Sequence, residues 1–132
     1  MKIESHLENL KESLAVIEES IIKGLIERQR TIGFHTSAAS VDLLEMLLHK
    51  NSLIDPGFII KHEWLKSKNT IKEKFSFNFP KKEEILDLIY EIEEKRNILC
   101  YGKPQKIEII QEVLNNFNQL KRLFKEVGVN EL

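Results

Sequence analysis

An arginine, an asparagine and a tyrosine lie close together near the end of a predicted helix. They are Arg96, Asn97 and Tyr101, within a stretch that reads E-E-K-R-N-I-L-C-Y-G-K-P from residue 93 to residue 104. A guanidinium binds a phosphate through paired hydrogen bonds, and a phenol can stack on a base or donate to a phosphate oxygen. These three residue types together therefore form a candidate set for binding a nucleotide or RNA.

Arg96 falls on the apolar face of its predicted helix. At about 100° per residue, it lies about 20° from Ile85 around the helix axis. The same arc holds Ile89, Ile92 and Leu99. Burying an unpaired guanidinium is costly, so Arg96 needs a carboxylate, a bound anion, backbone carbonyls or a water-filled cleft between subunits. The sequence leaves these alternatives open, including an ion pair with a glutamate of the same chain.

The other polar side chains make weaker candidates. His35 contributes to a site if its helix faces Arg96, and is otherwise a hydrogen-bonded structural residue. No two histidines have the His-x-x-x-His spacing that places two metal ligands on one helix face, so we expect neither a metal nor a cofactor. Ser37 and Ser40 have no identifiable base, and Cys100 has no supporting triad, so we expect all three to be packing residues.

Composition predicts a single domain over residues 1–132. Of the 132 residues, 42% are hydrophobic and 31% are charged, and the formal net charge is −1. Such a charge argues against wrapping duplex nucleic acid by electrostatics alone. One cysteine rules out an internal disulfide and fits a reducing compartment. No apolar run approaches the ~20 residues that cross a bilayer, so we expect a cytoplasmic protein without a membrane partner.

Apolar residues at helical spacing predict an all-α, up-and-down bundle of four to five helices. The expected helices cover residues 2–28, 31–33 to about 50, 58 to about 68, 80 to about 100, and 107–128. Pro80 favours the start of the fourth, because proline loses no hydrogen bond in a first turn. Gly102 and Pro104 then interrupt the chain before the fifth.

The segment Phe75-Ser-Phe-Asn-Phe79 alternates like a strand but has no partner strand. We therefore expect an extended loop that lays its aromatic rings on the bundle. Together with Phe58 and Trp64, these rings are expected in the core or an interface. Four lysines flank these aromatic residues: Lys72, Lys74, Lys81 and Lys82. Aromatic residues that stack on nucleic-acid bases usually have such basic neighbours.

The stretch from Arg96 to Gly102 resembles the signature of the HEPN superfamily. That signature has an arginine, usually a polar residue such as asparagine, and a histidine after four intervening residues. Arg96 and Asn97 match the first two positions, and Tyr101 stands at the histidine position. Residues 33–50 are also similar to the family's second helix, where small residues follow an aromatic-histidine pair and precede a leucine-rich stretch. The resemblance implies a homodimer whose two signatures face each other across a cleft.

The tyrosine at the histidine position determines the expected function. In family members with the full signature, the arginine and histidine act in metal-independent RNA cleavage. A phenol has an ordinary pKa of about 10, against about 6.5 for imidazole, so it is a poor base at neutral pH. We therefore expect a nucleotide- or RNA-binding domain without efficient catalysis. Its binding candidates are Arg96, Asn97, Tyr101 and His35.

Two alternative functions remain. The chain could be a metal-independent endoribonuclease, in which Arg96 stabilises charge and Tyr101, with or without His35, transfers protons. No catalytic residue is identified beyond these candidates. The chain could instead be a structural bundle that binds another protein, with Arg96 as an internal ion pair. The resemblance also implies a nucleotidyltransferase-like protein partner, in a toxin–antitoxin or nucleotide-handling context.

Overall fold

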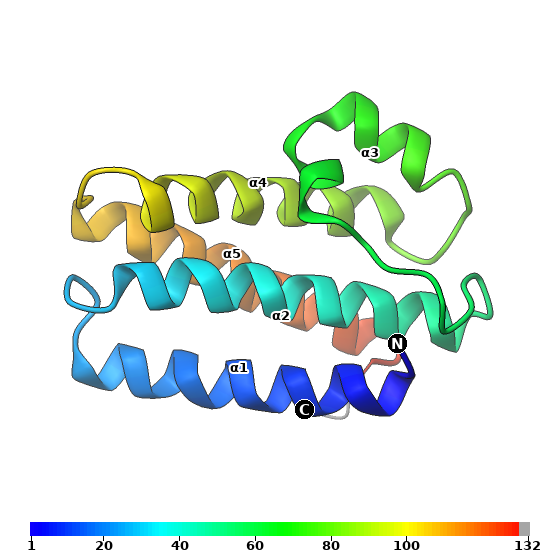
Figure 1. The fold of residues 1–132 in the computed structure, drawn as a ribbon, viewed down its shortest axis with the longest axis horizontal. Coiled ribbons are helices and arrows are strands. Elements are labelled where there is room, and N and C mark those ends of the chain that lie inside the picture. Colours follow the sequence, from blue (N-terminus) through cyan, green and yellow to red (C-terminus); the bar gives the residue numbers. More distant parts are fainter. Residues whose placement is uncertain (130–132) are drawn as a thin grey trace.

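The computed structural model describes residues 1–129, and within them it is an all-α bundle without strands (Figure 1). Its helices, in chain order, are α1 (Ile3–Lys23), α2 (Gln29–Lys50), a 3₁₀ helix η1 (His62–Lys66), α3 (Lys68–Lys74), α4 (Lys82–Tyr101) and α5 (Ile107–Glu126). The predicted fold class is therefore confirmed at the level of an all-α bundle.

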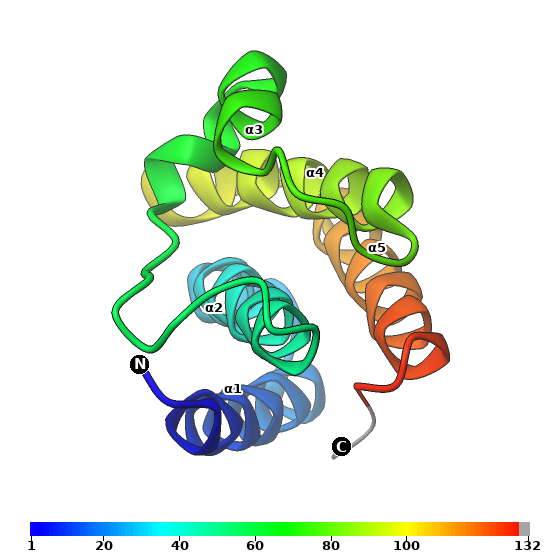
Figure 2. The same cartoon turned by 90° about the vertical axis from the view of Figure 1, so that its right-hand side faces the viewer.

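Helix α2 is the centre of the bundle. In the end-on view it lies between α1 on one side and α4 on the other, with α5 alongside (Figure 2), and it contacts all three. Almost every residue from Ser37 to Leu48 is buried, polar side chains included. A helix covered on all sides cannot keep its polar groups in water, so those on α2 must find partners within the protein.

The boundary between the first two helices differs from the prediction. Helix α1 ends at Lys23 rather than at residue 28, and α2 begins at Gln29 rather than at residues 31–33. Gly24 has a φ angle of +136°, a conformation that L side chains rarely adopt, so the chain turns there. Gly24 has the spacing of the apolar residues that predict the first helix, but its backbone conformation ends the helix there.

The prediction of a helix from residue 58 to about 68 is wrong in its bounds. Residues 58–61 are not helical, and η1 ends at Lys66. Ser67 is extended, with φ −137° and ψ 132°, and its hydroxyl accepts a hydrogen bond from the backbone N–H of Thr70. This side-chain cap starts a separate helix, α3, which the sequence analysis did not anticipate.

The segment from Phe75 to Phe79 is a loop, as predicted. Phe75 and Phe79 are buried, and the ring of Phe77 packs edge-on against the rings of Phe58 and Phe75. The aromatic alternation therefore packs a loop against the bundle.

The fourth and fifth helices lie close to their predicted ranges. Helix α4 begins at Lys82, after a left-handed Lys81, so Pro80 lies just before the helix rather than in its first turn. It ends at Tyr101, and α5 ends at Glu126 rather than at residue 128. Within residues 1–129, no helix is long and apolar enough to cross a membrane.

Candidate functional site

Arg96 lies in the last part of α4, and its side chain is only 15% exposed. The prediction that it does not face bulk solvent is confirmed. Its nearest carboxylate belongs to Glu93, one turn earlier, with Arg96 Nη1 3.7 Å from Glu93 Oε1. This distance is within ion-pair range but too long for a hydrogen bond.

The Arg96–Glu93 pair leaves hydrogen-bonding capacity unused. Arg96 Nε and Glu93 Oε1 are both buried, and neither has a hydrogen-bond partner within residues 1–129. A guanidinium has five N–H donors, and a buried donor without an acceptor costs about 1–3 kcal/mol. The guanidinium is therefore placed beside a carboxylate while retaining donors for another acceptor.

Glu93 is held by two other elements. Its carboxylate is 1% exposed, and Oε2 accepts hydrogen bonds from the Ser37 hydroxyl of α2 at 2.7 Å and from Nδ1 of His62 in η1 at 3.0 Å. Burial opposes ionisation of Glu93 most strongly, but the bonds from His62 and Ser37 and the nearby positive charges together lower its pKa. Glu93 is therefore a buried anion that fixes Arg96 in position.

Two aromatic rings lie beside the Arg96 guanidinium. Its Cζ is 5.8 Å from the ring centre of Phe34 on α2 and 6.0 Å from that of Tyr101. Both distances are at the outer limit of a cation–π contact. Phe34 is 48% exposed and Tyr101 is 73% exposed, so both rings have surface that the described residues leave uncovered.

A pocket of about 510 Å³ opens beside these rings. It is lined by Glu27, Arg30, Thr31, Phe34, His35, Cys100 and Tyr101. The predicted candidates His35 and Tyr101 therefore face one pocket, at the end of the bundle where α2 begins and α4 ends. Its lining combines the guanidinium of Arg30, the carboxylate of Glu27, an imidazole, a phenylalanine ring and a phenol, which suits a ligand that has an anionic group, a hydrogen-bond donor and a flat ring.

Nδ1 of His35 lies 3.2 Å from the hydroxyl oxygen of Ser13, which is hydrogen-bond distance. Burial lowers the pKa of His35, and the charge of Glu12 opposes this effect. A neutral imidazole at this position can accept or donate a hydrogen bond.

Asn97 is not part of this pocket. It is half-buried, next to Arg96 in sequence but about 100° around the helix, and the lining residues do not include it. Arg96 does not line the pocket either, but its guanidinium lies against Phe34 and Tyr101, which do. The structure therefore brings His35 and Tyr101 to one pocket, with Arg96 behind two of its aromatic rings.

Arg30 is a candidate that the sequence analysis missed. It is exposed at the pocket, and it precedes Phe34 by four residues, as Thr31 precedes His35. Residues four apart share a face of a helix, so these four side chains form two adjacent rows on α2. The four-residue spacing of Arg30 and Phe34 points to a shared helix face only if both residues are helical, and the predicted helix began after Arg30.

Cys100 contributes packing rather than chemistry. Its Sγ lies 3.4 Å from the carbonyl oxygen of Arg30, and burial raises the pKa of the thiol. A raised pKa disfavours the thiolate, which is the nucleophilic form. Ser37 is also unsuited to attack a substrate, because its hydroxyl is buried and donates to Glu93.

A second buried polar cluster joins α1 to α2. Nδ1 of His6 lies 2.7 Å from Asp42, and Nε2 lies 3.6 Å from Glu45, with the His49 ring 5.9 Å away. Both His6 and Glu45 are buried. The cluster is closed to solvent and lines none of the pockets described, so it serves to pair α1 with α2.

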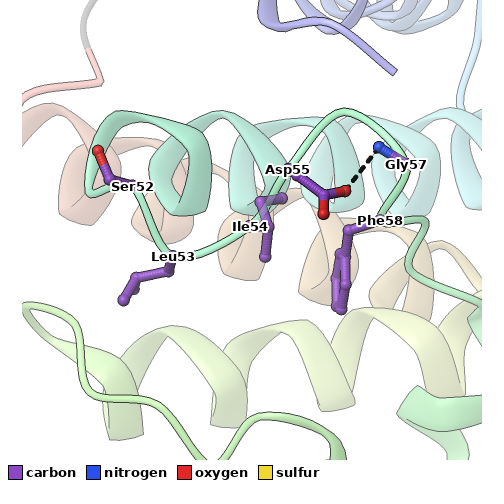
Figure 3. A pocket seen from close by; sticks show the side chains of 6 residues that line it. All are labelled: Ser52, Leu53, Ile54, Asp55, Gly57 and Phe58. Carbon is purple, nitrogen blue, oxygen red and sulfur yellow. Dashed lines mark hydrogen bonds between the residues drawn. The ribbon is translucent and has the colours of Figure 1, made fainter.

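The pocket of about 610 Å³ in Figure 3 does not add a chemical site. All its lining residues, from Ser52 to Phe58, belong to the loop after α2. Its one carboxylate, Asp55, accepts a hydrogen bond from the backbone N–H of Gly57 at 2.8 Å, which closes a tight turn. Leu53, Ile54 and Phe58 extend from the same side of the loop.

Residues 1–129 contain no group of three or more histidine, cysteine or carboxylate side chains that could hold a metal ion. Comparison with known proteins finds no matching family model, no matching curated protein and no matching solved structure.

Proposed function

We propose that the chain is a HEPN-like domain that binds a nucleotide or RNA at the pocket beside Arg96, without efficient RNA cleavage. The proposal includes a homodimer in which two such pockets meet in one cleft. It also includes a nucleotidyltransferase-like protein partner, in a toxin–antitoxin or nucleotide-handling context, because the signature from Arg96 to Tyr101 resembles domains of that kind.

One observation carries the proposal: the guanidinium of Arg96 is largely buried and lies beside a carboxylate, but not all of its N–H groups have a hydrogen-bond acceptor. Glu93 holds it at 3.7 Å without a hydrogen bond, and its Nε has no acceptor within the described residues. A purely structural arginine would use its donors on protein acceptors. An arginine with an unused donor, whose guanidinium lies against two exposed rings that line a pocket, supports binding of a phosphate there.

Weak or absent cleavage follows from the groups that surround the pocket. Tyr101 is exposed, and no hydrogen bond within residues 1–129 links its hydroxyl to a base that could take its proton. The alternative of a metal-independent ribonuclease rests on His35, which lines the same pocket as Tyr101 and whose lowered pKa keeps it neutral near pH 7.

Binding of a labelled single-stranded RNA to Arg96→Gln tests the proposal. A charge-assisted hydrogen bond is worth about 1.5–3 kcal/mol, so we expect binding at least about tenfold weaker than that of the unmodified protein. Arg122→Gln is the matched control, because Arg122 is exposed on α5 and the substitution removes the same charge. Equal affinities for the two variants would refute the role of Arg96.

Cleavage is measured in the same mixtures in the presence of a chelator. Intact RNA supports binding without catalysis. Cleavage that Arg96→Gln and His35→Ala abolish, and that Arg122→Gln leaves unchanged, would establish the ribonuclease instead. If no RNA or mononucleotide binds and Arg96→Gln changes only stability, the chain is a structural bundle.

A further inference from the structure

The positive charge of this chain is concentrated in one segment. Residues 58–82, here called the basic lobe, contain seven lysines and two glutamates, a net charge of +5, while the whole chain carries −1. The remaining residues therefore carry −6. The lobe includes η1 and α3, and both views show α3 standing outside α4 (Figures 1 and 2). A near-neutral total thus conceals a strongly basic segment, and clustered positive charge is the electrostatic feature of an anion-binding region.

A pocket of about 440 Å³ lies between the lobe and the first half of α4. This volume is in the range of small-molecule sites, about 300–1,000 Å³. One wall comes from α3 and the loop after it, and the other comes from α4. The lining residues are Lys68, Asn69, Ile71, Lys72, Phe75, Asn78, Lys82, Glu83, Leu86, Asp87 and Tyr90.

The three lysines of this pocket are not paired with carboxylates. Within residues 1–129, none of Lys68, Lys72 and Lys82 forms an ion pair, whereas the neighbouring Lys81 lies 3.6 Å from Glu84. Lys68 extends over the ring of Tyr90, with its Nζ 5.3 Å from the ring centre. These ammonium groups are therefore available to an external anion, and one of them sits on an aromatic face.

The rest of the lining defines the kind of anion. Glu83 and Asp87 are in the same pocket, and a ligand carrying only negative charge would be repelled by them. A nucleotide carries phosphate for the lysines, and amino or hydroxyl groups that can donate to the carboxylates. Asn69 and Asn78 can both donate to and accept from a base edge, and Tyr90 offers a ring for stacking.

We propose that this pocket is a second binding site, which takes a nucleotide unit either free or within single-stranded RNA. Lys82 and Arg96 are 14 residues apart on α4, about 21 Å along the helix, so the site is separate from the pocket beside Arg96. The inference deepens the proposed function, on which the choice of RNA as a probe rests. A strand that reaches both pockets crosses the surface of α4.

A triple variant, Lys68→Gln with Lys72→Gln and Lys82→Gln, tests the site with a fluorescein-labelled single-stranded RNA. We expect binding at least about tenfold weaker, and a logarithmic salt dependence that is shallower by about 2, because about 0.7 counterions are released per phosphate contact. The matched control replaces three exposed lysines outside the lobe with glutamine: Lys2, Lys11 and Lys125. Circular dichroism and the fluorescence of Trp64 verify folding of both variants.

Asn78→Asp provides a second test that keeps the lysines. It places a further carboxylate in the pocket, so we expect weaker binding, while Asn118→Asp on α5 should have no effect. Competition by AMP indicates a free nucleotide as the ligand, and competition by unlabelled RNA alone indicates RNA. Both results support the site.

Two outcomes overturn this inference. If the triple variant binds RNA as its control does, the lobe has no binding role, and the Arg96→Gln comparison still decides the proposed function separately. If a polyglutamate peptide competes as well as RNA of equal charge, the lobe binds acidic protein segments by charge alone. Loss of binding in the triple variant but not in Arg96→Gln would support the second site and refute the first.

Discussion

Two buried carboxylates, Glu93 and Asp42, each accept a hydrogen bond from a histidine of another element. His62 in η1 contacts Glu93, and His6 in α1 contacts Asp42, over sequence separations of 31 and 36 residues. Neither histidine has a motif around it in the sequence. Their partners are defined by packing between elements, which a linear pattern does not encode. The position of Arg96 could be predicted because it depends only on helical spacing.

Glu93→Gln should make the stability of the protein less dependent on pH. The pKa of Glu93 is lower in the folded protein than in the unfolded chain, so its ionised form stabilises the fold above about pH 4.3, and this contribution is lost as pH falls through the folded pKa. At pH 7 we expect the variant to be less stable by about 2 kcal/mol. The difference should narrow below about pH 4.

Urea denaturation between neutral and acidic pH measures this effect. Glu94→Gln is the matched control, because Glu94 is exposed on the same helix, and its curve should follow that of the unmodified protein. A constant stability difference between Glu93→Gln and the unmodified protein at every pH would show that Glu93 is not ionised in the fold.

His6→Ala should destabilise the bundle by about 3 kcal/mol, because it leaves buried carboxylates without their partner. His6 lies 2.7 Å from Asp42 and 3.6 Å from Glu45. If the His6–Asp42 contact is the main loss, Asp42→Ala should cost less in the His6→Ala background than alone, by about 1 kcal/mol. Unfolding free energies of the two single variants and the double variant measure this coupling. Strictly additive effects would contradict it.

At the scale of elements, the spacing of apolar residues predicts the long helices. The errors in the predicted helix bounds lie where a single residue, a glycine or a capping serine, ends or starts a helix. The prediction extended the first helix to residue 28 because it took Gly24 as part of the apolar stripe, whereas Gly24 breaks the helix. It also missed α3, which Ser67 starts through one side-chain hydrogen bond. The candidate site was half predictable for the same reason: its α4 residues lie on a regular helix, whereas Arg30 lies in the misplaced start of α2.

The α2–α4 contact depends on a small residue. A Cβ atom added to Gly33 would lie 2.8 Å from Cβ of Leu99 and 3.4 Å from Sγ of Cys100. Cβ of Leu99 is bonded to the backbone and cannot rotate away, so Gly33→Ala should push the two helices apart and destabilise the protein by about 2 kcal/mol. This change outweighs the higher helix propensity of alanine, about 1 kcal/mol.

Thermal or urea unfolding of Gly33→Ala measures the balance of these two effects. Ala38→Gly in the same helix gives the propensity contribution separately, because it changes the same two residue types where α2 is only partly buried. If Gly33→Ala is as stable as the unmodified protein, or more stable, the close approach of α2 and α4 does not limit packing.

At the scale of the whole molecule, total charge was a poor guide. The net charge of −1 argued against binding duplex nucleic acid by charge, but it describes the whole chain and not the distribution of charge along it. The lysines of residues 58–82 lie in one segment of the chain, which forms the basic lobe, and the acidic excess lies outside this segment. Sequence order alone gave the positions of these lysines, but the pocket between α3 and α4 depends on a helix that the sequence analysis did not anticipate.

The opposite end of α4 carries exposed apolar side chains at the proposed dimer cleft. Phe34 and Tyr101 border the pocket beside Arg96, and Ile98 and Ile26 are also exposed near the ends of α4 and α1. A two-fold interface presents each residue twice, so a single substitution introduces two changes per dimer. Phe34→Glu would remove two apolar rings and place two carboxylates in the same interface.

We therefore expect the unmodified protein to sediment as a dimer at tens of micromolar, and Phe34→Glu to raise the dissociation constant at least about tenfold, since 1.4 kcal/mol suffices for that factor. Ile59→Glu is the matched control: Ile59 is 63% exposed and does not line the pocket. Its dimer should be unchanged. A monomer at that concentration would remove the shared cleft, and Arg96 would then have to bind its phosphate at a pocket that one chain completes alone.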